Sequence, residues 1–185
     1  MSARAALRLE ETLGFADVYR YTPGKADWFA AGLPREGELA AVPRIGDVAD
    51  RDVAICGPAE SVGEVRRRLQ QVGQDLCVVV SNRRIVLGRV RARDLEGDPE
   101  AAVEDVMDPG PVTYRPDTLL AELVERLQEL PKTKANRILV TTSDGELIGL
   151  LRRADAERIL RELHAQHTEH PEHTGPRRGG TRDRS

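Results

Sequence analysis

An internal repeat constrains the fold of this 185-residue chain more than any other feature of its sequence. Residues near the start of each copy recur 58 positions later, and residues near its end recur 61 positions later. The recurring pairs are Asp47 and Asp105, Val48 and Val106, Pro58 and Pro116, Gly88 and Gly149, and Asp94 and Asp155. A repeat of this length is too long for a solenoid unit. It predicts two copies of a small α/β module packed about a pseudo-twofold axis.

The spacing of apolar residues predicts the same order of elements in both copies. The expected strands are 53–56, 76–80 and 85–90 in the first copy and 112–114, 137–142 and 147–151 in the second. The expected helices of the first copy are 61–72 and one after Asp94 that Gly97 and Pro99 cut short. Those of the second copy are one from residue 118 and one over 153–166. Each copy has the order β-α-β-β-α of a mixed α/β (α+β) fold. One face of such a sheet stays uncovered until two copies close a common core.

From about residue 44 to residue 163 the chain resembles a tandem pair of cystathionine-β-synthase (CBS) domains, also called a Bateman module. The resemblance rests on the Asp-Val that opens each copy, the proline after each first strand and the Gly-x5-Asp after each hairpin. In detail the chain is similar to actinobacterial proteins of this kind. We therefore expect one CBS domain over residues 44–100 and a second over residues 101–166.

The resemblance implies a regulatory ligand in the cleft between the copies, either an adenine nucleotide (AMP, ADP or ATP) or S-adenosylmethionine, and no required cofactor. Asp94 and Asp155 would accept hydrogen bonds from the ribose hydroxyls. A carboxylate suits this role because it offers acceptors to two adjacent hydroxyl groups. The residues that would contact the base are Val53 and Ile55 in one site and Val112 and Tyr114 in the other.

The chain departs from the family pattern at the position that contacts phosphate. The family often has Ser or Thr three residues before the aspartate, whereas this chain has Arg91 and Arg152. A guanidinium is a planar, permanently charged partner for phosphate and would favour highly charged nucleotides. The same side chains could instead fill the cleft or point into solvent. The alternative function is therefore a constitutive protein-interaction module that binds no small molecule, in which Asp94 and Asp155 cap helices.

The first forty residues resemble the carboxy-terminal part of a rhodanese domain, with helices expected over 2–13 and 24–34 and a strand over 17–21. In that family the loop with the catalytic cysteine precedes such a helix, so neither Cys56 nor Cys77 is expected to be a nucleophile. Both lie in apolar strands, which favours buried core thiols. The segment would expose several apolar side chains, namely Leu7, Leu13, Phe15, Trp28 and Phe29. We expect it to pack on the CBS pair or on a second subunit, with partial disorder as the alternative.

Composition and motifs favour a non-enzymatic, cytoplasmic protein. The formal net charge is −3 and aromatic residues make up 3% of the chain, which gives no sign of nucleic-acid binding. We find no apolar run or signal peptide, and no nucleotide-loop or hydrolase motif. The four histidines, at positions 164, 167, 170 and 173, lie where the last helix runs into a tail over 167–185 that is expected to be disordered, without a metal. The family resemblance implies a homodimer and an unidentified regulated protein as partners.

Overall fold

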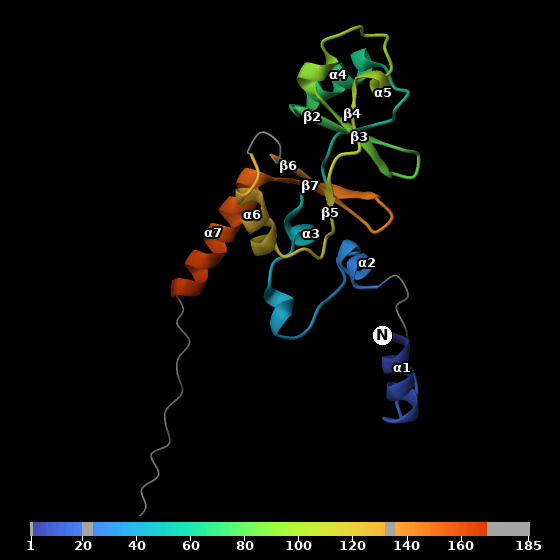
Figure 1. Cartoon of the computed structure of the whole chain (residues 1–185), viewed down its shortest axis with the longest axis vertical. Coiled ribbons are helices and arrows are strands. Elements are labelled where there is room, and N and C mark those ends of the chain that lie inside the picture. The colour runs from blue at the N-terminus through green and yellow to red at the C-terminus, as the bar shows by residue number, and fades with distance from the viewer. Residues whose placement is uncertain (1, 20–23, 132–135, 170–185) are drawn as a thin grey trace, which may run out of the picture.

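The computed structural model describes residues 2–19, 24–131 and 136–169, and it shows a mixed α/β protein with two sheets (Figure 1). The strands are β1 (Ile55–Cys56), β2 (Leu76–Val80), β3 (Val86–Arg91), β4 (Asp108–Pro109), β5 (Thr113–Tyr114), β6 (Arg137–Thr141) and β7 (Leu147–Arg152). The α-helices are α1 (Ser2–Glu11), α2 (Lys25–Ala30), α3 (Ile45–Val48), α4 (Val62–Val72), α5 (Val103–Val106), α6 (Leu120–Gln128) and α7 (Arg153–Glu169). Two 3-10 helices are η1 (Glu38–Ala41) and η2 (Ala92–Leu95). The fold class expected from the sequence is confirmed.

The two sheets are built alike. In the first, β2 lies between a parallel β1 and an antiparallel β3, and in the second, β6 lies between a parallel β5 and an antiparallel β7. Both hairpins carry a register shift at the same place, between Val79 and Val80 and between Val140 and Thr141. The strand β4 joins the first sheet beside β3. The repeated strand order predicted from the sequence is therefore confirmed.

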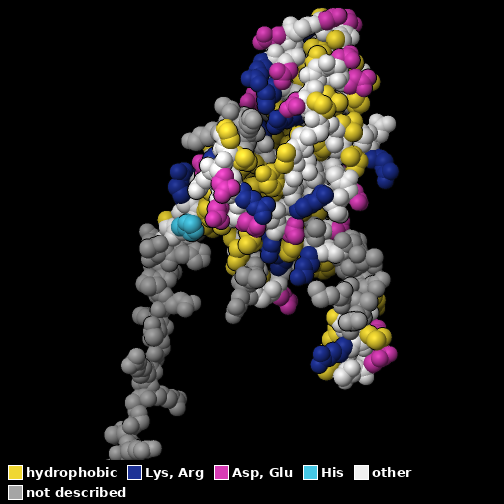
Figure 2. Space-filling model, in the orientation of Figure 1, with side chains coloured by type: hydrophobic (Ala, Val, Ile, Leu, Met, Phe, Trp, Pro, Cys, Tyr) yellow, Lys and Arg dark blue, Asp and Glu magenta, His cyan; other side chains and the backbone are white. Residues whose placement is uncertain are grey.

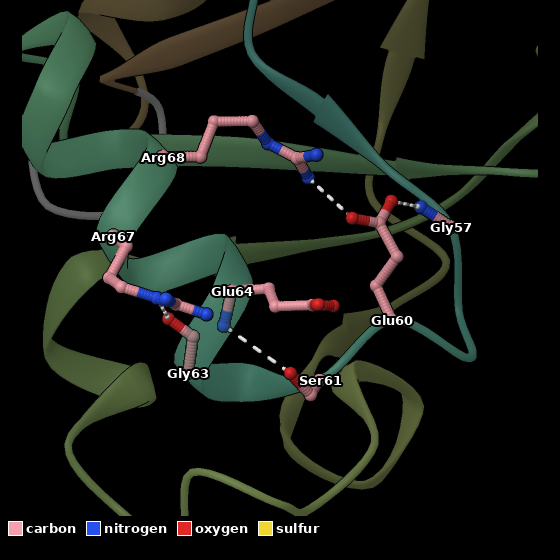
Figure 3. A network of polar contacts seen from close by, with 7 residues as sticks. All are labelled: Gly57, Glu60, Ser61, Gly63, Glu64, Arg67 and Arg68. Atoms are coloured by element: carbon pink, nitrogen blue, oxygen red, sulfur yellow. Dashed lines mark hydrogen bonds and ion pairs between the residues drawn. The ribbon is translucent and has the colours of Figure 1, made fainter.

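A polar network fixes the turn that leads from β1 into α4 (Figure 3). The Oγ atom of Ser61 accepts a hydrogen bond from the backbone N–H of Glu64 at 3.3 Å and so caps the helix. The Glu60 carboxylate accepts one hydrogen bond from the Gly57 N–H at 2.6 Å and another from the Arg68 guanidinium at 2.8 Å. These contacts satisfy polar groups at a helix start, where backbone N–H groups lack partners within the helix.

The short helix that opens each copy packs into the core of the other copy. Ile45 of α3 is fully buried among residues of the second copy, and Val103 of α5 is fully buried among residues of the first. The cluster around Ile45 contains Leu120, Leu123, Val124, Leu127, Ile138, Val140, Leu151 and Ala156. The cluster around Val103 contains Cys56, Val62, Val65, Leu69, Cys77, Val79, Val90 and Leu95. Neither core is complete without a helix from the other repeat.

Equivalent backbone hydrogen bonds hold the opening helices α3 and α5 against the other copy, and we call these two the exchanged helices. In each case two N–H groups at the start of the opening helix donate to carbonyl groups just after the first strand of the other copy. The bonds are Ile45 to Thr118 (3.0 Å), Gly46 to Pro116 (3.1 Å), Val103 to Glu60 (2.9 Å) and Glu104 to Pro58 (3.0 Å). The recurring prolines of the sequence thus mark the carbonyl groups that receive the exchanged helices.

A third apolar cluster joins the two sheets. It combines residues of both hairpins, namely Leu76, Val78, Val80, Leu139, Leu147 and Leu150. At the hairpin tips, the Val86 N–H donates to the Gly145 carbonyl and the Leu147 N–H donates to the Arg84 carbonyl, both at 3.0 Å. The closure of a common core by two copies is therefore observed.

The N-terminal segment divides into two parts. The helix α1 stands apart from the rest of the molecule (Figures 1 and 2), and Leu7, Leu13 and Phe15 are 53%, 59% and 58% exposed. The strand expected over residues 17–21 is wrong for residues 17–19, which lie in no sheet, and its last two residues are outside the described part. A strand needs a neighbour to accept its backbone hydrogen bonds, and none lies beside this segment within the described sheets.

The second part of the N-terminal segment packs on the CBS-like core. The Phe29 ring of α2 lies 5.5 Å from the Arg35 guanidinium and 4.6 Å from that of Arg44, and both are cation–π contacts. Arg35 also forms an ion pair with Asp47 at 3.0 Å. The expected packing is therefore seen for the segment around α2 and is absent for the described side chains of α1.

The helix α7 ends the described part of the chain. His164 and His167 belong to this helix, whereas His170 and His173 lie outside the described residues. No helix in residues 2–19, 24–131 or 136–169 has the length and apolar character needed to cross a membrane. Within the same residues, no group of three or more His, Cys, Asp or Glu side chains is arranged to hold a metal ion.

Candidate ligand site between the two copies

The chain crosses the strand β7 at Gly149 on its way from α3 to β1. Asp50 exchanges two backbone hydrogen bonds with Leu150, at 2.9 and 2.8 Å. A Cβ atom at position 149 would lie 2.4 Å from the Asp50 carbonyl oxygen, so this close crossing requires glycine. Gly88 lies at the equivalent crossing, where a Cβ atom would be 2.6 Å from the Met107 sulfur. The glycine of each Gly-x5-Asp motif therefore permits a crossing between the repeats.

A cavity of about 360 Å³ opens beside the Gly149 crossing. Its lining comes from both copies and consists of Val48, Asp50, Asp52, Val53, Gln74, Leu150, Leu151, Arg152, Asp155, Arg158 and Ile159. We call this cavity the Asp155 pocket. Its volume lies at the lower end of the range of about 300–1,000 Å³ that is typical of small-molecule sites.

Asp155 lies in the first turn of α7 and is partly open to solvent. One carboxylate oxygen accepts a hydrogen bond from the Arg158 guanidinium at 3.2 Å, and Arg158 also contacts the Glu162 carboxylate at 3.2 Å. The hydrogen bonds that Arg158 donates to the Asp155 and Glu162 carboxylates favour the charged guanidinium and raise the pKa of Arg158. A carboxylate has about four lone-pair positions, so Asp155 can still accept hydrogen bonds from a ligand.

The structure brings together three of the residues predicted to bind the ligand: Asp155, Arg152 and Val53 all line the Asp155 pocket. Ile55 instead packs against the apolar cluster between the sheets. Tyr114 packs against the core around Ile45, and Val112 is 76% exposed. None of these three is among the residues that line the Asp155 pocket.

Asp94, the counterpart of Asp155, makes local contacts at the start of η2. One carboxylate oxygen accepts a hydrogen bond from the Arg91 backbone N–H at 3.1 Å, and the other lies 3.5 Å from the Arg93 guanidinium. The capping role, which the sequence left open for both aspartates, is thus observed for Asp94. Arg91 itself lines a different cavity, near Asp75 and Arg137.

Gln74 is a pocket residue that the sequence analysis missed. Its amide nitrogen donates to the Asp52 carbonyl at 3.0 Å, and its amide oxygen accepts from the Ala54 N–H at 2.9 Å. Gln74 therefore holds residues 52–54 in place, including the pocket residue Val53. Both hydrogen bonds join residues that lie 20 or more positions apart, so no local sequence pattern predicts them.

The two cysteines are neighbours in the first core. Cys56 and Cys77 come from the adjacent strands β1 and β2 and are 2% and 0% exposed. A hydrogen bond with Cys77, together with burial, raises the pKa of the Cys56 thiol. Both cysteines are free, and their burial agrees with the expected structural role.

Comparison with known proteins identifies the repeated unit. The family model of the CBS domain matches the chain twice, over residues 45–96 and 103–162. An inosine-5'-monophosphate dehydrogenase of Korarchaeum cryptofilum is 31% identical over 126 residues, which are 67% of this chain and 25% of the dehydrogenase. The chain thus spans about a quarter of that curated relative, and the match carries no assignment of dehydrogenase activity.

Two solved structures share the fold at lower identity. The CBS-pair protein CBSX2 of Arabidopsis thaliana, solved in complex with AMP, is 24% identical with a TM-score of 0.56. The alignment covers 65% of this chain and 98% of CBSX2. The cytosolic domain of the Mg²⁺ channel MgtE, solved in complex with ATP, is 22% identical with a TM-score of 0.57, and the alignment covers 65% of this chain and 51% of that one. These similarities establish the fold alone.

Proposed function

Because this chain belongs to the CBS-domain family, we propose that it is a regulatory protein that senses an adenine nucleotide in the Asp155 pocket. The observation that carries the proposal is the meeting of the Asp155 carboxylate with aliphatic side chains of both copies in one cavity. AMP, ADP and ATP are the candidate ligands, with S-adenosylmethionine as an alternative. The complexes of CBSX2 with AMP and of MgtE with ATP support this class of ligand.

The lining of the pocket matches the parts of adenosine. Aliphatic side chains such as Val53, Leu151 and Ile159 offer an apolar surface for the planar base. Asp155 offers acceptors for the two ribose hydroxyls. The charged residues of the lining are three aspartates and two arginines, so the pocket itself provides no excess of positive charge for phosphate. Recognition in this pocket therefore rests on the nucleoside part of the ligand.

Ligand binding would couple the two copies. Val48 and Val53 belong to the first repeat and Asp155 to the second, so a ligand between them contacts both. A ligand that binds one arrangement of the copies more tightly shifts the population towards that arrangement. A partner protein that reads the arrangement then responds to the ligand.

A constitutive interaction module is the second candidate function. The observation that favours it is the exposed apolar side chains of the N-terminal segment, Leu7, Leu13 and Phe15. Exposed apolar patches are typical of protein-interaction surfaces. The proposal extends to a cytoplasmic homodimer of actinobacterial type, with residues 1–40 as a non-catalytic remnant of a rhodanese domain. The contacts of Phe29 and Arg35 with the core support a structural role for the remnant.

A thermal-shift screen tests the sensing function. AMP, ADP, ATP and S-adenosylmethionine are each titrated into the protein and into Asp155→Asn, with Asp94→Asn as the matched control. A ligand at about one hundred times its dissociation constant adds about 2.7 kcal/mol to the free energy of unfolding. We expect the full shift in the protein and in Asp94→Asn, and a shift of about half that size in Asp155→Asn, because about tenfold weaker binding leaves the ligand at only about ten times its dissociation constant. No shift with any of the four ligands in folded protein would favour the interaction module.

A further inference from the structure

A cavity of about 390 Å³ lies where the N-terminal segment meets both copies. The N-terminal segment contributes Asp27 of α2, which lies beside the hairpin of β6 and β7 (Figure 1). The first copy contributes Arg51 and Arg84, and the second copy contributes Glu146. We call this cavity the junction pocket. It shares no lining residue with the Asp155 pocket, and Asp27 lies outside the residues that the CBS-domain model matches.

The junction pocket is lined by charges of both signs. Its charged residues are two arginines, Arg51 and Arg84, and two acids, Asp27 and Glu146. Within the described part of the chain, the side chains of Arg51, Arg84 and Glu146 form no ion pair with one another or with any other residue. Opposite charges that line one cavity without pairing are available to the charges of a ligand. The lining therefore suits a ligand that carries one charge of each sign.

Arg84 has an uncommon backbone conformation at the tip of the hairpin of β2 and β3. Its φ is +60°, and among the described residues it is the one non-glycine residue with a positive φ. Its N–H donates to the Ser81 carbonyl at 2.9 Å, and its carbonyl accepts from the Leu147 N–H at 3.0 Å. Glycine adopts this conformation more easily because it has no Cβ atom. A strained non-glycine backbone is typical of functional sites, and here the strained residue lines the junction pocket.

Most of the uncharged lining of the junction pocket is aliphatic. The second copy contributes Leu147, which is 5% exposed, and the half-buried Ile148. The end of α2 contributes the small residues Ala30 and Ala31. An apolar part of a ligand gains free energy when it leaves water for such a surface. Aliphatic surface beside charges of both signs therefore suits a small zwitterion with an aliphatic side chain.

We propose that the junction pocket binds a free α-amino acid with an aliphatic side chain, namely leucine, isoleucine or valine. The guanidinium groups of Arg51 and Arg84 bind the ligand carboxylate, whose geometry they match through paired, charge-assisted hydrogen bonds. The ligand ammonium group donates hydrogen bonds to the carboxylates of Glu146 and Asp27. The ligand side chain packs against Leu147.

A bound amino acid contacts three parts of the chain at once, because Asp27, Arg84 and Glu146 come from the N-terminal segment, the first copy and the second copy. It therefore stabilises the packing of α2 on the CBS pair. The site requires no nucleotide, so it does not depend on the function proposed for the Asp155 pocket.

Isothermal titration calorimetry with L-leucine, L-isoleucine and L-valine tests the proposal directly. The test variant is Arg84→Gln, and the matched control is Arg83→Gln. Both positions are exposed at the same hairpin tip, and Arg83 is not among the residues that line the junction pocket. We expect the dissociation constant of the tightest-binding amino acid to rise at least about tenfold in Arg84→Gln and less than about twofold in Arg83→Gln, because hydrogen bonds to charged groups contribute strongly.

A second pair of variants and two leucine analogues test the recognition of each charge. Glu146→Gln should also weaken binding at least about tenfold, whereas Asp144→Asn, at an exposed position of the same hairpin tip that does not line the pocket, should change it less than about twofold. The analogue 4-methylpentanoate lacks the ammonium group, and 3-methylbutylamine lacks the carboxylate. Each should bind the unmodified protein at least about tenfold more weakly than leucine.

Three results would overturn the proposal. They are the absence of binding of all three amino acids to protein that circular dichroism shows to be folded, an equal loss of affinity in a test variant and its control, and equal affinities for leucine and 4-methylpentanoate. Asp155→Asn should leave the amino-acid affinity unchanged, so failure of nucleotide sensing and failure of the junction pocket give different results.

Discussion

Asp94 and Asp155 occupy equivalent positions in the two repeats but have different surroundings. Asp155 lies in the first turn of the 17-residue helix α7 and lines a cavity, whereas Asp94 lies in the four-residue helix η2 and accepts a hydrogen bond from the Arg91 backbone. Position 158 in the second copy is an arginine that contacts Asp155, and the equivalent position in the first copy is Gly97. The comparison shows that a repeated motif fixes the backbone path without fixing the chemistry of its side chains.

The same contrast holds for the two cavities. The Asp155 pocket has three aspartates and two arginines among its lining residues, and the cavity that Arg91 lines has one aspartate and four arginines. The charge balance of the lining therefore differs in sign between the two cavities. Four experiments break or sharpen this comparison.

The largest expected effect comes from Ile45→Ala, which tests whether the two repeats form one unit. Ile45 is fully buried in the core of the second copy, so its truncation should lower the free energy of unfolding by about 2–5 kcal/mol. Urea denaturation measures the change, and Val72→Ala, at a 56% exposed site, is the control. Since the opening helices are exchanged, we expect a single transition. Two separate transitions would mean that the copies unfold independently.

The next largest loss of stability is expected at Gly149 and Gly88, the two glycines where a chain segment crosses a strand closely. An added Cβ atom at Gly149 meets the backbone oxygen of Asp50 at 2.4 Å, whereas at Gly88 the nearest atom is the Met107 sulfur at 2.6 Å, which belongs to a flexible side chain. Gly149→Ala should therefore cost about 1–3 kcal/mol and exceed the cost of Gly88→Ala. Thermal unfolding of both variants checks the order. Equal costs would show that the two crossings are equally tight.

The third experiment compares the two aspartates as ligand acceptors. Asp155→Asn keeps the shape of the side chain and removes its charge, so we expect about a tenfold loss of affinity for the nucleotide identified in the screen. Asp94→Asn should change the affinity by less than about twofold, because its carboxylate already serves the turn of η2. Calorimetric titration measures both. A larger loss in Asp94→Asn would reverse the assignment of the site.

The smallest effect is the pH-dependent contribution of the ion pair between Asp75 and Arg137 to the stability of the fold. The hydrogen bonds from Arg137 lower the pKa of Asp75 below its usual value. A carboxylate with a lowered pKa in the folded state stabilises the fold above its unfolded pKa of about 3.9, and this contribution is lost as the pH falls through the lowered value. Asp75 is 69% exposed, so solvent screens the pair and the contribution is about 0.2–1 kcal/mol.

Asp75→Asn isolates that contribution. The variant should be less stable than the unmodified protein at pH 7, and the difference should vanish at a pH below the lowered pKa. Urea denaturation at the two pH values measures it. A difference that persists in acid would mean that Asp75 acts through packing and not through its charge.

Local sequence patterns predicted the longer strands and helices of both repeats, because each of these has its own signal, but did not predict the short elements α3, α5 and β4. The run Leu76–Val80 is apolar throughout and forms the buried strand β2 over those residues. Ser61 and Gly73 mark the two ends of α4 through capping and a left-handed backbone. The strand expected at residues 17–21 failed over its described residues, since a strand depends on a neighbour that the local sequence does not supply.

The candidate site was only partly accessible to sequence reasoning. Asp155, Arg152 and Val53 were predicted, and they meet in one pocket. Gln74 was missed because its contact with Asp52 joins residues 22 positions apart. The place of Asp155 in a pocket also depends on distant residues such as Val53, whereas the contacts of Asp94 with Arg91 and Arg93 are local.

The sequence by itself determined that two like modules exist, where their longer strands and helices lie, and which glycines and aspartates recur. The tertiary structure decided that the opening helices are exchanged, so that Ile45 completes the second core and Val103 the first. It also decided which recurring aspartate faces a cavity and where the arginines gather. The physical reason is that strand and helix preferences are local properties of the chain, whereas burial and charge balance arise from residues that only folding brings together.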